Sequence, residues 1–347
     1  MTRLTVLGSC GAWPEPDRAC TGFLLSHNGF NVVIDLGYGT MSRLLTHTTA
    51  RDVDAVVITH EHPDHMADLS ALGRAWHYTV QAPPASPGPD ESAPRAQVPE
   101  HPPRLPLFCT PGTLRRLEAT EPRPHPTTIF DVRDLDSGGR SGSDVEHGAT
   151  REFRSEPQLL PEQEHDPAQP SAAPEHDPAQ RPSPAPEHGA AQGLRAAPEH
   201  GPAQGLRAAL ELGAAQGHPS GWDVGPFRLT SVLLPHHVPN HGVRLSAPGL
   251  NVVYSGDCGP SRLLVELARD ADLLICEATL QGAPPADEPR QLMTAAEAGR
   301  TAAEAKVSTL LLTHFWPGTD RAVSVAEARA EFAGDVLVAD EGLTLTL

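Results

Sequence analysis

The chain has 347 residues, which is enough for one large domain or two modest ones. Its formal net charge of −18 at pH 7 disfavours a broad electrostatic contact with nucleic-acid phosphates, which normally requires a basic surface. Part of the acidity lies in proline-rich segments that the composition predicts to be unfolded, so the charge argues only moderately against a nucleic-acid partner.

The cysteine pattern and the hydropathy indicate a soluble, cytoplasmic protein. The five cysteines are odd in number and form no CxxC pair, which is typical of reduced thiols inside the cell. The first eight residues resemble a strand rather than a targeting segment, and no apolar stretch is long enough to cross a bilayer. We therefore expect no membrane partner.

The first part of the chain alternates short strands with glycine-rich turns. Strands are predicted at residues 4–7, 22–26, 31–35 and 55–58, and a helix from Met66 to about His77. Strands separated by tight turns favour a mixed or mostly antiparallel sheet.

Two tracts interrupt the regular pattern, at about 81–106 and 156–220. The first is dense in proline, alanine and serine; the second contains a degenerate repeat of eleven to twelve residues between 161 and 217. The repeat lacks the apolar residues needed to offset the entropy of ordering, so we interpret both tracts as insertions within a single domain, 1–347. The histidines that recur in register in the repeat leave a metal-buffering tract as the alternative.

Regular structure resumes at Trp222 with apolar strands that each end in polar residues. We expect strands at 227–232, 251–255, 272–279 and 309–315, and helices at 261–269, 294–305 and 323–332. In α/β proteins the carboxyl ends of strands are where sites are built.

The segment from His60 to His65 contains three imidazoles and two carboxylates directly after the strand at 55–58. Because alternate residues of a strand share a face, His60 and His62 are expected on the same side, with Asp64 and His65 in the following turn. The alternative is a polar loop that is merely rich in histidine, but this density of metal-binding groups at a strand end favours a metal site.

Other strand ends supply further donors of the same kind. The candidate ligands are His60, His62, Asp64, His65, His236, Asp257 and His314. Imidazole nitrogens with a few carboxylate oxygens suit two Zn²⁺ ions, with Mn²⁺ or Fe²⁺ as alternatives, and no thiolate is required. A water that bridges two such ions would be acidified to hydroxide, which Asp64, the predicted catalytic residue, could orient.

These motifs together resemble the metallo-β-lactamase superfamily, and within it the ribonuclease Z branch. The segments that carry the resemblance are His60–His65, His236–Arg244, Tyr254–Asp257, Glu277–Thr279 and Leu312–Phe315. The resemblance covers residues 1–80, 107–155 and 222–347. It implies an αββα sandwich with a dinuclear metal site at one edge, and a branch whose phosphodiesterases act on RNA or on cyclic nucleotides and often form homodimers.

The resemblance also implies how the ligands divide. One ion would take His60, His62 and His236, the other would take Asp64, His65 and His314, and Asp257 would bridge the two. The family register favours His236 over its neighbour His237. Residues that could support the site from behind are Asp35, His237, His241 and Glu277. Asp35 is expected to hydrogen-bond the histidine segment, with metal binding as the alternative. His237 and His241 could donate hydrogen bonds to the ligands or act as a substitute general acid, and the alternative is that both are solvent-exposed histidines of a loop. Glu277 could orient a neighbour in the site, with a buried structural carboxylate as the alternative.

The chain departs from the ribonuclease Z pattern at three places. Cys276 stands where that branch has a histidine before the Glu-Ala-Thr triplet, and Leu292 stands where it has the histidine thought to protonate the leaving oxygen. The arm that clamps tRNA is not found after Arg244. We therefore predict a phosphodiesterase acting on a small, cyclic nucleotide, with tRNA disfavoured. The alternatives are a ribonuclease Z-like endonuclease acting on RNA 3′ ends, and a metal-binding protein of this fold with weakened catalysis.

Overall fold

The computed structural model describes residues 1–81, 103–137, 221–284 and 290–347, which all belong to one compact unit. The predicted insertion at 156–220 lies outside the described residues, as does nearly all of the insertion predicted at 81–106. At the edges of this first insertion the structure differs from the prediction. Gln81 still belongs to a π-helical turn, and a strand already begins at Leu105.

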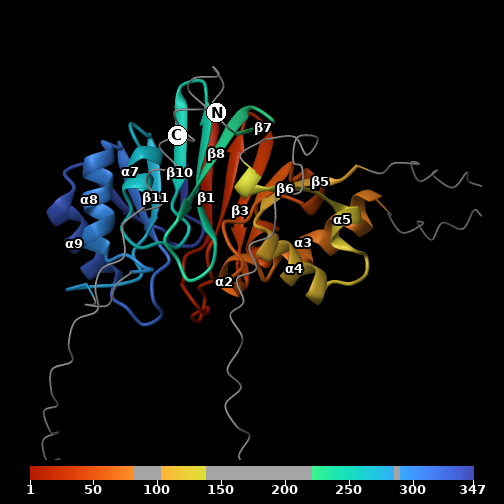
Figure 1. Ribbon diagram of the computed structural model, residues 1–347, viewed down its shortest axis with the longest axis horizontal. Coiled ribbons are helices and arrows are strands. Elements are labelled where there is room, and N and C mark those ends of the chain that lie inside the picture. Colours follow the sequence, from red (N-terminus) through yellow and green to blue (C-terminus); the bar gives the residue numbers. More distant parts are fainter. Residues whose placement is uncertain (82–102, 138–220, 285–289) are drawn as a thin grey trace, which may run out of the picture. The chain divides into compact units, whose positions relative to one another are not determined.

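Two mixed seven-stranded sheets form the centre of the described part of the chain (Figure 1). The strands of the first sheet are, in spatial order, β14 (Thr344–Thr346), β1 (Thr2–Gly8), β2 (Gly22–His27), β3 (Phe30–Leu36), β4 (Ala55–Val57), β5 (Leu105–Cys109) and β6 (Phe130–Asp134). Those of the second are β13 (Asp335–Val338), β12 (Thr309–Thr313), β11 (Leu273–Glu277), β10 (Leu250–Tyr254), β9 (Asn240–Ala247), β8 (Phe227–Leu234) and β7 (Trp222–Val224). In each sheet one part is antiparallel and the other parallel, as the short strands and tight turns predicted.

Helices cover the outer face of each sheet. The first sheet is covered by α1 (Thr40–Leu44), α2 (Pro63–Met66), α3 (Leu69–Trp76), α4 (Pro111–Thr120) and α5 (Pro126–Ile129), with a short 3₁₀ turn at Ala50–Asp52. A second 3₁₀ turn, Leu135–Ser137, contributes Leu135 to the cluster between the sheets. The second is covered by α7 (Arg262–Leu267), α8 (Ala295–Ala305) and α9 (Arg321–Glu331). The layers therefore follow the order αββα, which confirms the predicted fold (Figure 1).

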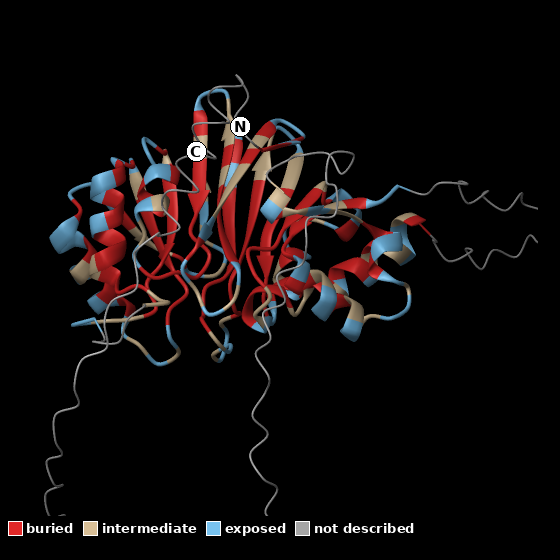
Figure 2. Cartoon of the chain, in the orientation of Figure 1, coloured by how far each residue is buried: buried red, intermediate tan, exposed pale blue. Residues whose placement is uncertain are grey.

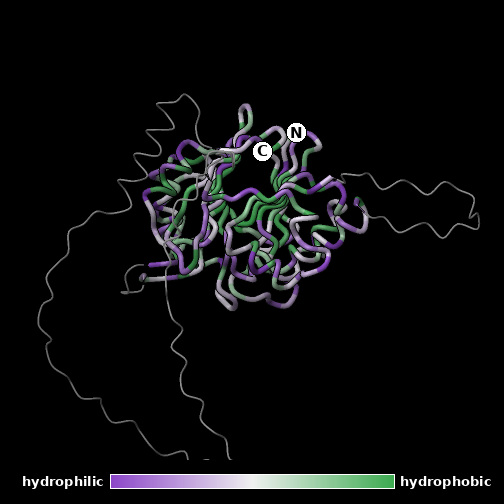
Figure 3. Tube along the Cα trace, turned by 45° about the vertical axis from the view of Figure 1, so that its right-hand side comes forward, coloured by the Kyte–Doolittle hydropathy of each residue, from purple (hydrophilic) through white to green (hydrophobic). Residues whose placement is uncertain are grey.

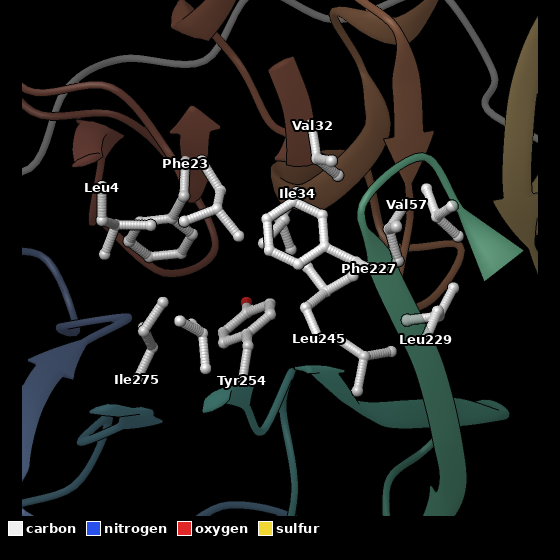
Figure 4. Close-up of a cluster of buried hydrophobic side chains, with 14 of the residues drawn as sticks. Leu4, Phe23, Val32, Ile34, Val57, Phe227, Leu229, Leu245, Tyr254 and Ile275 are labelled. Carbon is white, nitrogen blue, oxygen red and sulfur yellow. The ribbon is translucent and has the colours of Figure 1, made fainter. Parts of the chain in front are cut away.

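The alternation of side chains along each strand explains the layered packing. On β2 and β3, Phe23 and Ile34 point between the sheets, whereas Leu24 and Val33 pack against the helices of the first layer. Figure 4 shows the cluster between the sheets, where Phe23 lies edge-to-face against Tyr254, with ring centroids 5.4 Å apart. Strands that carry apolar side chains on both faces must be covered on both sides, here by helices on one side and by the other sheet on the other. Figures 2 and 3 show these strands as buried and hydrophobic.

Six strands of the described residues were not predicted, namely β5, β6, β7, β9, β13 and β14. Of these, β9 lies nearest to predicted site residues in the sequence. Residues 236–242 were expected to be a loop, but β9 begins at Asn240 and pairs with both β8 and β10. Pro239 and Gly242 conceal the strand, because both residues are poor strand formers. Its turn into β10 consists of Pro248 and Gly249 alone, with Gly249 at a φ of 76°. Among the described residues, no helix has the length and apolar character needed to span a membrane.

Candidate metal centre

The carboxyl ends of strands from both sheets meet at one edge and bring seven predicted ligands together. They form two groups, one of His60, His62, His236 and Asp257, the other of Asp64, His65, Asp257 and His314. Within each group all donor atoms lie within 4.8 Å of one another. Asp257 belongs to both groups, so the grouping is the same as the one implied by the family resemblance.

The spacing of the donor atoms in the first group suits a tetrahedrally coordinated ion. His62 Nδ1 lies 3.1 Å from both His60 Nε2 and His236 Nε2, and Asp257 Oδ2 lies 3.9 Å from each of those Nε2 atoms. Nitrogens bound tetrahedrally to zinc at about 2.0–2.1 Å are separated by about 3.3 Å. Both nitrogen–nitrogen distances from His62 are therefore close to the separation that one shared ion would impose.

In the second group, carboxylate and imidazole donors are equally close. His314 Nε2 lies 3.2 Å from Asp64 Oδ2 and 3.1 Å from Asp257 Oδ2. His65 Nε2 lies 3.3 Å from Asp257 Oδ1, yet both of these buried atoms lack a hydrogen-bond partner. Buried polar atoms normally have partners, and a cation between the two would satisfy both. The donor set therefore fits a divalent metal ion.

A second set of contacts orients the imidazoles. The nitrogens that face away from the centre bond to nearby oxygens: His60 Nδ1 to Thr59 Oγ1 at 3.1 Å, His65 Nδ1 to Asp35 Oδ2 at 2.7 Å, His236 Nδ1 to Gln291 O at 3.0 Å and His314 Nδ1 to Thr279 Oγ1 at 2.8 Å. Each acceptor favours a proton on Nδ1, which leaves the Nε2 lone pair free to bind a metal.

Asp35 is fully buried at the end of β3 and supports the histidine segment from behind. Its carboxylate accepts hydrogen bonds from the Thr59 amide at 2.8 Å, the Thr59 hydroxyl at 2.9 Å, His65 and, at 3.0 Å, the Tyr254 hydroxyl. The bond from Tyr254 joins the two sheets. Asp35 and the predicted ligand His314 both have a φ of 55°, a left-handed conformation that costs a residue with a side chain about 1–2 kcal/mol.

Glu277 acts on the second group through Thr279. It accepts hydrogen bonds from the Thr279 hydroxyl, from the Cys258 amide and, at 3.2 Å, from the Met293 amide. Burial, reinforced by the nearby charge of Asp257, raises the pKa of Glu277 to about 8. Because Thr279 also bonds to His314, Glu277 holds the hydroxyl that orients this ligand.

The backbone amide of Ala12 donates a 2.6 Å hydrogen bond to Asp64 Oδ2. Although burial works against ionisation, the imidazoles of His65 and His314 hold the pKa of Asp64 well below its usual range. Burial lowers the pKa of His236 to about 4, so this imidazole is neutral near pH 7. Neutral imidazole and ionised carboxylate are the forms that bind a metal.

The remaining predicted residues occupy different places. His237 is exposed, with its ring centroid 5.2 Å from that of His236. His241 is buried and pairs with Asp136 at 2.7 Å, so its side chain does not join either ligand group. Leu292, half-buried, directly follows the residue whose carbonyl bonds to His236.

Sequence reasoning missed several residues that position the ligands: Ala12, Thr59, Tyr254, Thr279 and Gln291. Thr59 and Thr279 lie inside recognised motifs, so their hydroxyls could have been considered. Ala12 and Gln291 contribute backbone atoms, for which the sequence carries no signal.

The sequence is similar to known proteins over part or all of its length. Residues 16–150 match the sequence profile of the family described as the metallo-beta-lactamase superfamily. An uncharacterized protein of Mycobacterium leprae is 42% identical over 126 residues, which make up 36% of this chain and 44% of that protein. A ribonuclease Z of Myxococcus xanthus is 27% identical over 363 residues, which cover all of this chain and 98% of that enzyme.

Solved structures share the fold. The metallo-beta-lactamase fold protein YhfI of Bacillus subtilis superposes with a TM-score of 0.63 at 19% identity, over 99% of this chain and 98% of that chain. The unliganded yeast PDE1 superposes with a TM-score of 0.55 at 10% identity, over 100% of this chain and 99% of that chain. At these identities the likeness shows the fold alone.

Proposed function

We propose that this chain, of which residues 16–150 match the metallo-beta-lactamase superfamily, is a dinuclear metal-dependent phosphodiesterase acting on a small, cyclic nucleotide. The observation that carries this proposal is the pair of ligand groups that share Asp257. Two-metal sites are widely used for displacement at phosphorus, and the nitrogen-rich donor set favours zinc, with Mn²⁺ or Fe²⁺ as alternatives.

The chain's residues would prepare the reaction mainly by positioning. When bound, the ions would polarise a phosphoryl oxygen and acidify a water molecule near neutral pH. Asp64, ionised and held by the Ala12 amide, would orient the attacking water. The outer partners of His65 and His314 would keep these imidazoles from rotating when a substrate arrives.

Protonation of the leaving oxygen is the step for which the described residues provide the fewest candidate groups. Leu292 cannot transfer a proton, although its position is next to the residue that contacts His236. The imidazole of His241 pairs with Asp136. Of the two predicted supporting histidines, this leaves the exposed His237, whose ring lies next to that of His236, as the candidate acid. The leaving oxygen of a cyclic nucleotide is an alkoxide, so its departure would gain more from an acid than the departure of a p-nitrophenolate does.

A ribonuclease Z-like activity on RNA 3′ ends is the second candidate, and the full-length similarity to the Myxococcus enzyme favours it. The net charge of −18 and the two-residue turn between β9 and β10 favour a small substrate instead. The third candidate, a metal-binding protein with weakened catalysis, is favoured by Leu292. A homodimer stays a prediction.

Two assays separate these candidates. Hydrolysis of bis(p-nitrophenyl) phosphate needs little acid assistance, so the zinc-loaded protein should cleave it if the centre is catalytic. Failure with bound zinc, and again after addition of Mn²⁺, would leave only the metal-binding candidate. If hydrolysis occurs, comparing kcat/KM for cyclic AMP with that for a tRNA precursor decides between the two enzymes.

A further inference from the structure

Two of the four tryptophans are exposed, and they contact each other. The side chains of Trp76 and Trp222 are buried, whereas Trp13 is 48% and Trp316 is 43% exposed. The rings of the exposed pair lie edge-to-face, with centroids 5.1 Å apart and an interplanar angle of 79°. Each ring covers only part of the other, so within the described part of the chain the pair presents aromatic surface to solvent.

The pair lies beside the proposed metal centre. Trp13 directly follows Ala12, whose amide nitrogen is 2.6 Å from Asp64 Oδ2. Standard backbone dimensions therefore place the Trp13 Cα within about 8 Å of that ligand oxygen. Trp316 comes two residues after the ligand His314, so its Cα lies within about 7.6 Å of the His314 Cα.

Backbone contacts join the two tryptophan-bearing loops to each other. The Gly11 amide donates to the Phe315 carbonyl, and the Phe315 amide donates to the Ser9 carbonyl, each at 2.9 Å. The Gly318 amide donates to Glu15 Oε1 at 2.8 Å. A Cβ on Gly11 would lie only 2.6 Å from the His314 ring, which shows how closely the first loop lies against this ligand. The position of the aromatic pair is thus fixed relative to the centre.

We propose that Trp13 and Trp316 form a stacking surface for the base of a nucleotide whose phosphate lies at the metal centre. This inference rests on the proposed function, which it deepens by assigning base recognition to two residues. Aromatic side chains stack on any base without requiring specific hydrogen bonds, and a ribose spans the gap between a base and its phosphate. Removing such a stack weakens binding by about 10- to 100-fold.

The test uses two substrates with the same leaving group, only one of which has a base: thymidine 5′-(p-nitrophenyl) phosphate and methyl p-nitrophenyl phosphate. Trp13→Ala and Trp316→Ala should each raise KM for the thymidine ester about 10- to 100-fold with little change in kcat. Neither change should alter KM for the methyl ester. Trp13→Phe, which keeps an aromatic ring, should restore most of the affinity.

The matched control is Tyr78→Ala, which removes another aromatic side chain with 47% exposure, located beyond the C-terminal end of α3. It should leave both substrates unaffected. Equal effects of the tryptophan substitutions on the two esters, or no effect on either, would overturn the proposal. So would a change in oligomeric state, measured by light scattering, because the pair would then be a contact between copies of the chain.

A binding measurement separates this proposal from the proposed function. Thymidine monophosphate should quench the tryptophan fluorescence of the metal-loaded protein, whereas inorganic phosphate should not. The quenched emission should be that of the exposed pair, with the emission of the buried Trp76 and Trp222 unchanged. Quenching without hydrolysis of any ester would refute the phosphodiesterase but leave the base-stacking surface standing. Hydrolysis of both esters without quenching by the nucleotide would refute the surface alone.

Discussion

Replacing Asp35 with asparagine should weaken one metal position specifically. This buried carboxylate acts only as a hydrogen-bond acceptor. Its donors are the Thr59 amide, the Thr59 and Tyr254 hydroxyls and His65 Nδ1. An asparagine has one acceptor oxygen and one NH₂ group. In either orientation of the amide, the NH₂ group faces a donor that the carboxylate had satisfied.

The more damaging orientation places the NH₂ group against His65. The imidazole could then accept that bond only by moving its proton from Nδ1 to Nε2, and a protonated Nε2 cannot bind a metal. The other orientation leaves the Thr59 amide without a partner, at a cost of about 1–3 kcal/mol. Loss of a partner behind a ligand typically lowers metal affinity about 10- to 100-fold. The affected ion should be the one next to His65.

The assay is a competitive chelator titration with zinc content measured by mass spectrometry. Wild type should release two ions, whereas Asp35→Asn should release one ion at a chelator concentration about 10- to 100-fold lower. The control is Tyr254→Phe, which removes one donor to Asp35 but leaves His65 its acceptor. It should lower the free energy of unfolding by about 1 kcal/mol and keep both ions. An Asp35→Asn protein with unchanged titration would refute this reasoning.

Three further predictions concern the acid, the loop next to His314 and the thiols. Leu292→His should raise kcat for cyclic AMP about 100-fold by supplying a proton donor, and leave bis(p-nitrophenyl) phosphate hydrolysis unchanged; equal gains on both substrates would contradict this role. Gly11→Ala should displace His314 and lower zinc content, whereas Gly29→Ala, whose Cβ would meet open space, should affect only stability; zinc analysis and thermal unfolding distinguish the two. The native protein should not react with a thiol reagent at pH 8, because burial raises the pKa of all five cysteines, that of Cys109 to about 12. The contribution of Cys109 to stability is present below pH 9 and lost progressively as the pH rises from 9.0 to about 12. Because all five thiols are buried, their reaction at pH 8 should require denaturant.

The candidate ligands, which the structure brings together in two groups, could be recognised because each lies within a short, distinctive motif at the end of an apolar strand. Alternation along the strand also placed His60 and His62 on one side, and the αββα layers followed from the family resemblance. Contacts between distant segments could not be predicted in this way. The carbonyl of Gln291 reaches His236 from 55 residues away, and the sequence around it contains no donor or acceptor motif.

Errors arose where local preference and tertiary structure disagree. Proline and glycine made residues 236–242 look like a loop, yet pairing with strands on both sides makes a strand from Asn240 onward. His241 was a candidate for a supporting role at the site, with a solvent-exposed loop histidine as the alternative. In the strand, however, its side chain pairs with Asp136 of the other half of the fold.

The shared carboxylate of Asp257 has a consequence for how the two halves of the chain stay together. His60, His62, Asp64 and His65 come from the first sheet, whereas Asp257 and its partners His236 and His314 follow strands of the second. Ions bound here would therefore act as a cross-link between the halves, much as a disulfide joins distant segments. With the halves cross-linked in this way, a longer connection between β6 and β7 would add little to the entropic cost of folding, because the entropy lost on closing a loop rises only slowly with the length of the loop. The centre would then hold the two sheets in register as well as carry out chemistry.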